Sequence, residues 1–247
     1  MSSSKKLSAR KKEFIKKLAE RGIRKDIIKL FADFDLRVFF DSLFEERFYT
    51  DTPVPVGFGQ TGDDPYTLAL MLHYLQPNED DRVLEIGTGS GFSTALLSLL
   101  CKEVYTVEYI EELALIAKNR LFNYDFDNIR FYAGDATEQC SVLSTEFDKA
   151  IIHAGCRKRP LSVIGIMKEN GLMVFPMGPA LQQQILCLHN SPDEVHGDRF
   201  KIDYHEFCVS DIIKGSYGIE APDTKDMLAS DPEPIHPESV EQADQND

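Results

Sequence analysis

The chain has 247 residues, of which 43% are hydrophobic, and a formal net charge of −14 at pH 7. This length and composition suit one globular domain of ordinary to large size with extensions, and they exclude a wholly disordered protein. No apolar run approaches the ~20 residues that a membrane helix needs, and the basic N-terminal stretch lacks the apolar segment of a secretory signal. We therefore expect a cytoplasmic protein without a membrane partner.

Charge is distributed unevenly along the chain. Residues 1–25 hold ten Lys and Arg against two Glu, whereas residues 219–247 hold nine Asp and Glu against one Lys. The stretch between them carries sixteen basic and thirty acidic residues. A body this acidic repels phosphate backbones, so we expect no nucleic-acid partner. The five cysteines are scattered without a C-x-x-C pair, which disfavours a disulfide framework or a zinc cluster, and we expect no metal.

The spacing of apolar residues predicts the elements in chain order. Residues 8–49 have helical periodicity with a break at 21–23, residues 50–65 are a loop rich in proline, glycine and aspartate, and 66–75 is a helix. From residue 82 onwards, strands and helices alternate. The predicted strands are 82–87, 103–109, 128–135, 149–155, 171–178 and 184–190, and the predicted helices between them are 92–101, 110–124 and 161–168.

This alternation predicts an α/β fold, a doubly wound and mostly parallel sheet of the seven-stranded type with helices on both faces. The two late strands lie close together in the sequence, which indicates an antiparallel addition at one edge. We expect three parts: N-terminal helices with a substrate-side loop (1–65), a ligand-binding core (66–218) and an acidic, disordered tail (219–247).

The stretch "VLEIGTGSGF", residues 83–92, places three glycines between a strand and a helix. Such a turn presents free N–H groups and the positive end of a helix to a ligand, although a tight turn without a ligand has the same pattern. Glu108 ends the next strand, where an acid can accept both hydroxyls of a ribose, and Asp135 ends the third strand. We expect these groups to share one crevice.

The spacing G-x-G-x-G differs from the dinucleotide fingerprint, because Phe92 stands where its last glycine belongs. Glu85 adds a negative charge that a pyrophosphate disfavours, which argues against a dehydrogenase. A cationic ligand that contains adenosine suits the same charge, and S-adenosyl-L-methionine carries both an ammonium and a sulfonium.

Five segments of the chain resemble the class I S-adenosylmethionine-dependent methyltransferases: "VLEIGTGSGFSTALLSLL", "VYTVEYIEELALIAKNRL", "NIRFYAGDA", "FDKAIIHAG" and "MKENGLMVFPMGP". Two shorter stretches, "PVGFGQT" and "FPMGP", narrow the resemblance to the protein-L-isoaspartate O-methyltransferase family. The resemblance runs from about residue 12 to 190. It implies a Rossmann-like methyltransferase that binds S-adenosyl-L-methionine and, as a monomer, methylates isoaspartyl residues of damaged proteins in a repair reaction.

The resemblance also implies roles for individual residues. Glu85, Gly87, Thr88 and Gly89 would line the methionine end of the cofactor, Glu108 the ribose, Tyr109 the adenosine, and Asp135 and Ala136 the adenine. Gln60 and Thr61 would cover the sulfonium and the incoming acceptor, Gln184 would lie near the cofactor, and Thr61 and Asp63 would be the catalytic residues.

One departure from the family pattern bears on the acceptor. The family's loop is G-Q-T-I-S-Q-P, whereas this chain has "GQTGDDP", with Asp63 in place of the serine. A second carboxylate a few ångströms from a carboxylate acceptor repels it by roughly 1–4 kcal/mol. The exchange is tolerable if Asp63 is protonated, points away or pairs with a cation. Otherwise the acceptor differs, and if Asp63 acts as a base, the acceptor is a hydroxyl or an amine.

Two alternatives therefore stay open beside the repair function: a methyltransferase with another acceptor, and a protein that binds the cofactor without transferring a methyl group. His153, at the end of a predicted strand, is better explained as a satisfied structural histidine than as a site residue. The basic residues 157–159 either capture an acidic acceptor or form a solvated loop.

Overall fold

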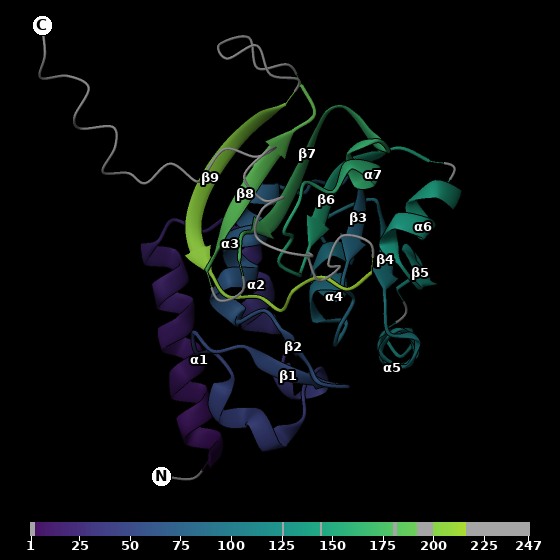
Figure 1. Cartoon of the computed structure of the whole chain (residues 1–247). Coiled ribbons are helices and arrows are strands. Elements are labelled where there is room, and N and C mark those ends of the chain that lie inside the picture. The colour runs from purple at the N-terminus through teal and green to yellow at the C-terminus, as the bar shows by residue number, and fades with distance from the viewer. Residues whose placement is uncertain (1–2, 125, 144, 180–181, 192–199, 216–247) are drawn as a thin grey trace, which may run out of the picture.

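The computed structural model describes residues 3–124, 126–143, 145–179, 182–191 and 200–215. In this part of the chain, a seven-stranded sheet with the order β5-β4-β3-β6-β7-β8-β9 forms the centre (Figure 1). Its strands are β3 (Arg82–Ile86), β4 (Glu103–Glu108), β5 (Ile129–Ala133), β6 (Phe147–Ile152), β7 (Met167–Met177), β8 (Gln183–His189) and β9 (Lys201–Cys208). No helix among the described residues combines the length and apolarity needed to cross a bilayer.

The first five strands of that order run parallel, β8 pairs antiparallel with β7, and β9 pairs antiparallel with β8. The direction in which the sheet grows reverses at β3, which has β4 on one side and β6 on the other. In sheets of this kind, the loops at the carboxyl ends of the strands diverge at the reversal and leave a crevice for a ligand. The glycine turn follows β3 and therefore lies at this point.

Helices cover both faces of the sheet. One face packs against α3 (Pro65–Leu75), α4 (Phe92–Ser98) and α5 (Glu111–Phe122), and the other against α6 (Ala136–Val142) and α7 (Leu161–Ile164). Successive strand residues point to opposite faces, so Val83 joins the first core and Leu84 the second. This two-sided burial explains why the parallel strands have nearly continuous apolar sequences.

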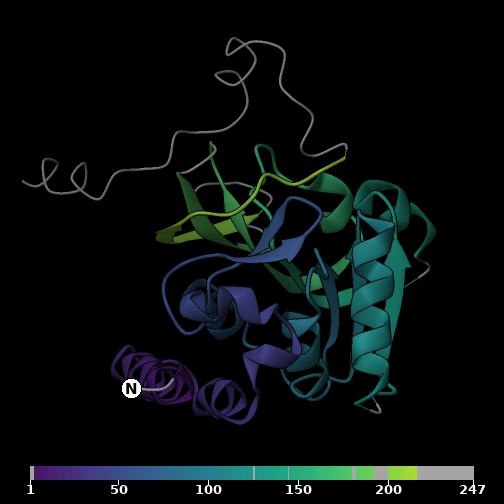
Figure 2. The ribbon, with the colours of Figure 1, turned by 90° about the horizontal axis from the view of Figure 1, so that it is seen from below.

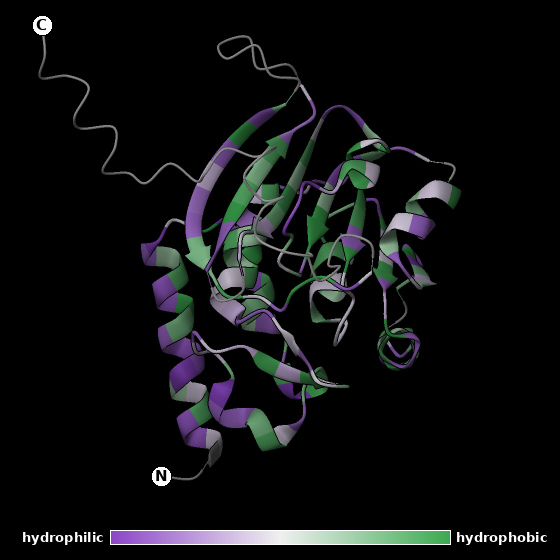
Figure 3. Cartoon of the chain, viewed as in Figure 1, coloured by the Kyte–Doolittle hydropathy of each residue, from purple (hydrophilic) through white to green (hydrophobic). Residues whose placement is uncertain are grey.

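The N-terminal region packs outside α3 and α4. It contains α1 (Ser3–Glu20), α2 (Lys25–Asp33) and the short 3₁₀ helices η1 (Leu36–Val38) and η2 (Ser42–Arg47). Phe31 of α2 contacts both Phe14 of α1 and Phe92 of α4, with ring centroids 5.5 Å apart in each pair. Figure 3 shows α1 with alternating hydrophilic and hydrophobic patches, as expected of a helix with one solvated face.

Two segments complete the carboxyl edge of the sheet. The first is the antiparallel hairpin of β1 (Val54–Gly57) and β2 (Gln60–Gly62). The second, residues 209–215 after β9, we call the C-terminal strap. It crosses the edge through backbone hydrogen bonds, since Gly155 N donates to Asp211 O and Ile213 N donates to Gly155 O. Figure 2 shows the strap, in yellow, passing beside the hairpin.

The doubly wound fold class and the mostly parallel sheet are confirmed, but several element predictions were wrong. The predicted helix 161–168 ends at Ile164, because Gly165 follows it and Met167 already pairs with Phe147 on β6. The predicted loop 50–65 contains the β1–β2 hairpin. The expected antiparallel addition at one edge is present, since β8 pairs antiparallel with β7, and β9, which was not predicted, pairs antiparallel with β8.

Two elements, α6 and β9, were not predicted at all. The predicted tail, 219–247, lies outside the described residues. The three-part division at residues 65 and 218 stays a prediction.

Candidate functional site

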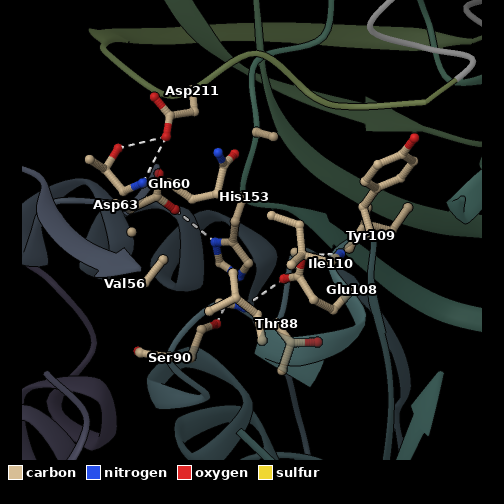
Figure 4. Close-up of a pocket in the computed structure, with 18 of the residues that line it drawn as sticks. Val56, Gln60, Asp63, Thr88, Ser90, Glu108, Tyr109, Ile110, His153 and Asp211 are labelled. Carbon is tan, nitrogen blue, oxygen red and sulfur yellow. Dashed lines mark hydrogen bonds and ion pairs between the residues drawn. The ribbon is translucent and has the colours of Figure 1, made fainter. Parts of the chain in front are cut away.

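A pocket of about 950 Å³, its open mouth included, lies at the carboxyl edge of the sheet. Its lining comes from the glycine turn after β3, the ends of β4 and β6, the start of α6, the β1–β2 hairpin and the C-terminal strap (Figure 4). Most of the predicted site residues line it: Gln60, Thr61, Asp63, Gly87, Thr88, Gly89, Glu108, Tyr109 and Ala136. The crevice predicted at these strand ends is present, with the glycine turn and Glu108 in its lining, whereas Asp135 does not line it.

The three positions of the turn require glycine for different structural reasons. Gly87 has φ +95°, and a Cβ there would lie 3.3 Å from the Cβ of His153, so it lets β6 approach closely. Gly91 has φ +83°, and a Cβ would lie 3.1 Å from Leu121 Cδ1 on α5. At Gly89, the nearest atom to an added Cβ is 4.0 Å away. Two glycines thus serve the internal packing, and Gly89 leaves its backbone open toward the pocket.

Glu108 is fixed in the pocket by backbone donors. Its Oε2 accepts a hydrogen bond from Gly89 N at 2.9 Å, and its Oε1 accepts one from Ile110 N at 3.0 Å. The residue is only 7% exposed. Each carboxylate oxygen has a second lone pair, so the group keeps acceptor capacity for a ligand in the pocket. Tyr109 beside it lies half exposed at the rim.

Glu85 lies beneath the lining and is completely buried. Its Oε2 accepts hydrogen bonds from Thr94 Oγ1 at 2.5 Å and from Thr106 Oγ1 at 2.7 Å. Since Thr106 donates to Glu85, the 2.5 Å contact between Thr88 and Thr106 has the Thr88 hydroxyl as its donor. A chain of hydroxyls thus connects the buried acid to Thr88, which lines the pocket.

Asp63 pairs with His153, which lies ninety residues further along the chain. Asp63 Oδ2 is 2.7 Å from His153 Nδ1, and Asp63 Oδ1 accepts from the hydroxyl of Ser210 in the strap at 3.1 Å. The other ring nitrogen, Nε2, lies 2.9 Å from Ser93 Oγ and 3.3 Å from Glu85 Oε1. The imidazole is therefore held between two carboxylates, and Figure 4 shows its contact with Asp63.

The charge state of His153 follows from this position. Burial, the largest influence, disfavours the imidazolium, but hydrogen bonding and charge attraction from Asp63 and Glu85 outweigh it and raise the pKa of His153 to about 10. At neutral pH the ring is a cation. Of the three explanations for an aspartate at position 63, the structure supports pairing with a cation.

Asp64 has a different task from Asp63 despite being its neighbour. Its carboxylate caps α3 by accepting from Tyr66 N and Thr67 N at 3.0 Å each, and from Thr67 Oγ1 at 2.6 Å. Burial raises the pKa of Asp64 in spite of these bonds. The acid pair in "GQTGDDP" thus consists of one site residue and one helix cap.

The hairpin is tied to the strap across the mouth of the pocket. Both the backbone N–H and the hydroxyl of Thr61 donate to Asp211 Oδ2, at 2.8 and 2.9 Å. Together with the Ser210–Asp63 contact, two successive strap residues hold two of the predicted site residues. Lys214, also in the strap, is exposed and lines the pocket.

The structure does not bring three predicted cofactor residues into the lining. Glu85 lies behind it, as described. Asp135 caps α6 by accepting from Thr137 N at 2.7 Å, and its carboxylate packs against Gly215 of the strap. Gln184 donates its Nε2 to His205 O at 2.7 Å on β9. The neighbouring Gln183, not Gln184, approaches the edge of the site, through Gly155 and Ser210.

Sequence reasoning missed the strap and undervalued His153. Ser210, Asp211 and Lys214 follow a strand that was not predicted, so nothing placed them near the glycine turn. His153 is different, because it ends a strand next to β3 in a parallel sheet. That position alone was a signal that its side chain could lie in the crevice.

The family comparison decides the class of protein. The model of the protein-L-isoaspartate(D-aspartate) O-methyltransferase family matches residues 9–204. The chain belongs to this family. The predicted family and enzyme class, an S-adenosylmethionine-dependent O-methyltransferase, are thereby confirmed.

Individual relatives agree with this assignment. The protein-L-isoaspartate O-methyltransferase of Petrotoga mobilis is 36% identical over 202 residues, which cover 81% of this chain and 93% of the relative. The enzyme of the same name from Myxococcus xanthus is 39% identical over 182 residues, which cover 72% of this chain and 85% of the relative.

Solved structures support the fold. A protein-L-isoaspartate O-methyltransferase superposes with a TM-score of 0.69 at 21% identity, over 84% of this chain and 67% of the other. A Plasmodium falciparum protein described by the same activity, in complex with S-adenosyl-L-homocysteine, superposes with a TM-score of 0.62 at 20% identity, over 81% and 96%.

Proposed function

We propose that this chain transfers the methyl group of S-adenosyl-L-methionine to the carboxylates of isoaspartyl residues in damaged proteins. The observation that carries the proposal is the pairing of Asp63 with His153. The sequence alone left an uncompensated carboxylate next to a carboxylate acceptor. In the structure a buried imidazolium neutralises it, so the departure from the family loop no longer argues against the family's substrate.

The inner half of the pocket fits the cofactor. Glu108, held by Gly89 N and Ile110 N, suits a ribose, because a fixed carboxylate can accept from two neighbouring hydroxyls. The open backbone at Gly89 and the negative charge of the buried Glu85 suit the ammonium and sulfonium. When bound, the cofactor supplies an activated methyl group on its sulfonium. Adenine contacts from Asp135 and Ala136 remain part of the proposal.

The outer half of the pocket has to position the acceptor. An isoaspartyl carboxylate is ionised at neutral pH, so its oxygen can form the new bond to the methyl carbon without a general base. The old carbon–sulfur bond breaks, and its electron pair stays on sulfur. The work of the protein is to hold the reacting atoms in line at about 3 Å and to exclude water. Thr61, fixed by Asp211, is placed for this task.

A hydroxyl or amine acceptor is a weaker fit to the site. Such an acceptor needs a base with a free lone pair in the pocket. Both ring nitrogens of His153 are engaged, one by Asp63 and the other by Ser93 and Glu85. We therefore rank the carboxylate acceptor above the alternatives.

We further propose that the enzyme works as a monomer in the cytoplasm and does not act on nucleic acid. All five cysteines are buried free thiols, a state that suits a reducing compartment. The net charge of −14 disfavours nucleic acid.

The test is transfer of labelled methyl from S-adenosyl-L-methionine to an isoaspartyl peptide, with the matched aspartyl peptide as control. We expect the wild-type chain to label only the isoaspartyl peptide, and Asp63→Ser to do so as well. No labelling by wild type together with labelling by Asp63→Ser would assign the wild-type enzyme to another acceptor. No labelling by either protein would contradict the proposed substrate altogether.

A further inference from the structure

Three charged side chains are buried together between the cofactor and acceptor halves of the pocket. The side chains of Asp63, Glu85 and His153 are 3%, 0% and 10% exposed. They come from the loop after β2, from β3 and from the end of β6, so the tertiary fold alone brings them together. Burying two carboxylates beside each other is costly unless a cation lies between them.

The contacts fix His153 in that role. Nδ1 faces Asp63 at 2.7 Å, and Nε2 faces Ser93 at 2.9 Å and Glu85 at 3.3 Å. Because position 87 is a glycine, nothing displaces the ring from this place. A Cβ there would press on the Cβ of His153. The ring is locked, and it contributes charge and orientation rather than proton transfer.

Other charged groups near the cluster do not take over this function. Asp64 faces α3, where it caps the helix. Asp211 and Lys214 of the strap line the pocket, but Asp211 is engaged by Thr61, and Lys214 is exposed to solvent. Among the described residues, His153 is the cation in ion-pair contact with Asp63.

We infer that His153 is a positioning residue for the acceptor. Its pairing with Asp63 neutralises this carboxylate and holds it against the wall of the pocket. The pocket can then admit a carboxylate substrate. Asp63 and His153 then act as an ion pair in the place of one neutral side chain, and His153 is needed because Asp63 carries a charge. This inference rests on the proposed function and specifies how the chain can keep that substrate while carrying an aspartate in the acceptor loop.

The test is a double-mutant cycle of His153→Gln, Asp63→Asn and the two combined, with the isoaspartyl peptide as acceptor. His153→Gln leaves Asp63 negative and unpaired, so we expect kcat/KM for the peptide to fall at least ~10-fold, mainly through KM. Adding Asp63→Asn removes that charge and should restore kcat/KM to within ~3-fold of wild type. Asp63→Asn alone removes the same charge and should lower kcat/KM less than His153→Gln does.

Cofactor affinity, measured by calorimetry, separates a charge effect from damage to the fold. An extra negative charge does not repel the sulfonium, so His153→Gln should bind S-adenosyl-L-methionine at least as tightly as wild type. His189→Gln is the matched control, because His189 pairs with Asp203 at 3.0 Å outside the pocket lining. It should change neither activity nor affinity.

The outcomes distinguish the inference from the function on which it rests. An active wild type with an equally active His153→Gln would overturn the inference alone. So would a double variant or an Asp63→Asn variant that is as slow as His153→Gln. A wild-type enzyme that does not methylate the isoaspartyl peptide would overturn the proposed function and the inference with it.

Discussion

The cofactor half and the acceptor half of the pocket are built in different ways. The cofactor half consists of successive strand ends, with Gly87 and Gly89 after β3 and Glu108 at the end of β4, held by backbone hydrogen bonds within about twenty residues of sequence. The acceptor half depends on side-chain contacts between distant segments, such as Asp63 with His153 and Thr61 with Asp211. The first half repeats a general plan, whereas the second is specific to this chain.

This difference implies that the two halves can be damaged separately. Substitutions in the cofactor half should change the affinity for S-adenosyl-L-methionine. Substitutions in the acceptor half should change the kinetics with the peptide and leave cofactor binding intact. A substitution that disturbs cofactor binding and peptide kinetics equally would show that the two halves are not independent.

The largest effect is expected from Glu108→Ala. The variant loses a fixed carboxylate whose hydrogen bonds to a ribose are worth roughly 1.5–3 kcal/mol each. We expect calorimetry to show an affinity for S-adenosyl-L-methionine about 100-fold below that of wild type. Glu103→Gln, at the other end of β4 where Glu103 pairs with Arg82 and Arg130, serves as the control. An affinity within ~3-fold of wild type would mean that Glu108 does not bind the cofactor.

The charge of His153 in the acceptor half can be tested without any ligand, through the pH dependence of the free energy of unfolding. The folded-state pKa of His153, about 10, lies above the ordinary value of about 6.5 expected in the unfolded chain. Its stabilising contribution is therefore complete below about pH 6.5 and is lost as the pH rises toward 10. Each pKa unit corresponds to about 1.4 kcal/mol, so part of this shift is measurable.

We expect urea unfolding of the wild-type protein to show a free energy of unfolding that decreases across this range. In His153→Gln the decrease should be smaller. Identical slopes for the two proteins would show that the ring is not held as a cation.

A moderate effect is expected from Asp211→Ala, which unties the hairpin from the strap. The variant loses two hydrogen bonds from Thr61, both near the protein surface, worth about 1 kcal/mol in total once water replaces them. KM for the isoaspartyl peptide should rise about 5-fold, with cofactor affinity unchanged. Asp203→Ala on β9 is the control. A loss of cofactor affinity instead would place the strap in the other half of the pocket.

The smallest effect is expected from Gln184→Ala. The family resemblance puts this residue near the cofactor, whereas in the structure its side chain donates to His205 O on the neighbouring strand. We expect unchanged affinity for S-adenosyl-L-methionine and a stability loss of about 1 kcal/mol from the missing hydrogen bond. A drop in affinity of more than ~5-fold would restore the role implied by the resemblance.

The contrast between local sequence patterns and contacts of distant segments also explains which elements the sequence could predict. The strands β3, β4 and β6 were predicted because burial on both faces favours apolar runs. The edge strand β9 was missed, since its sequence "KIDYHEFC" is half exposed and mostly polar. The error at 161–168 arose because "LSVIGIMK" is apolar throughout, and no periodicity separates the short α7 from the start of β7.

In the site, too, only the residues placed by a local sequence pattern could be predicted. Glu108 and the glycine turn could be placed from spacing, because successive parallel strands end at one edge. The contact between Asp63 and His153 joins residues ninety positions apart through side-chain orientation, which no local pattern encodes. The strap residues depended on β9 and were lost with it. Sequence reasoning did identify Asp63 as the position where the acceptor question would be decided.

The most direct test of the central claim is the protonation state of His153, observed through the ¹⁵N chemical shifts of its ring nitrogens by NMR at pH 8. His153→Gln identifies the signals by their disappearance. We expect an imidazolium with both nitrogens protonated, which persists until the pH approaches 10. A neutral ring at pH 8 would contradict it, because Asp63 would then stand uncompensated in the wall that receives the acceptor carboxylate.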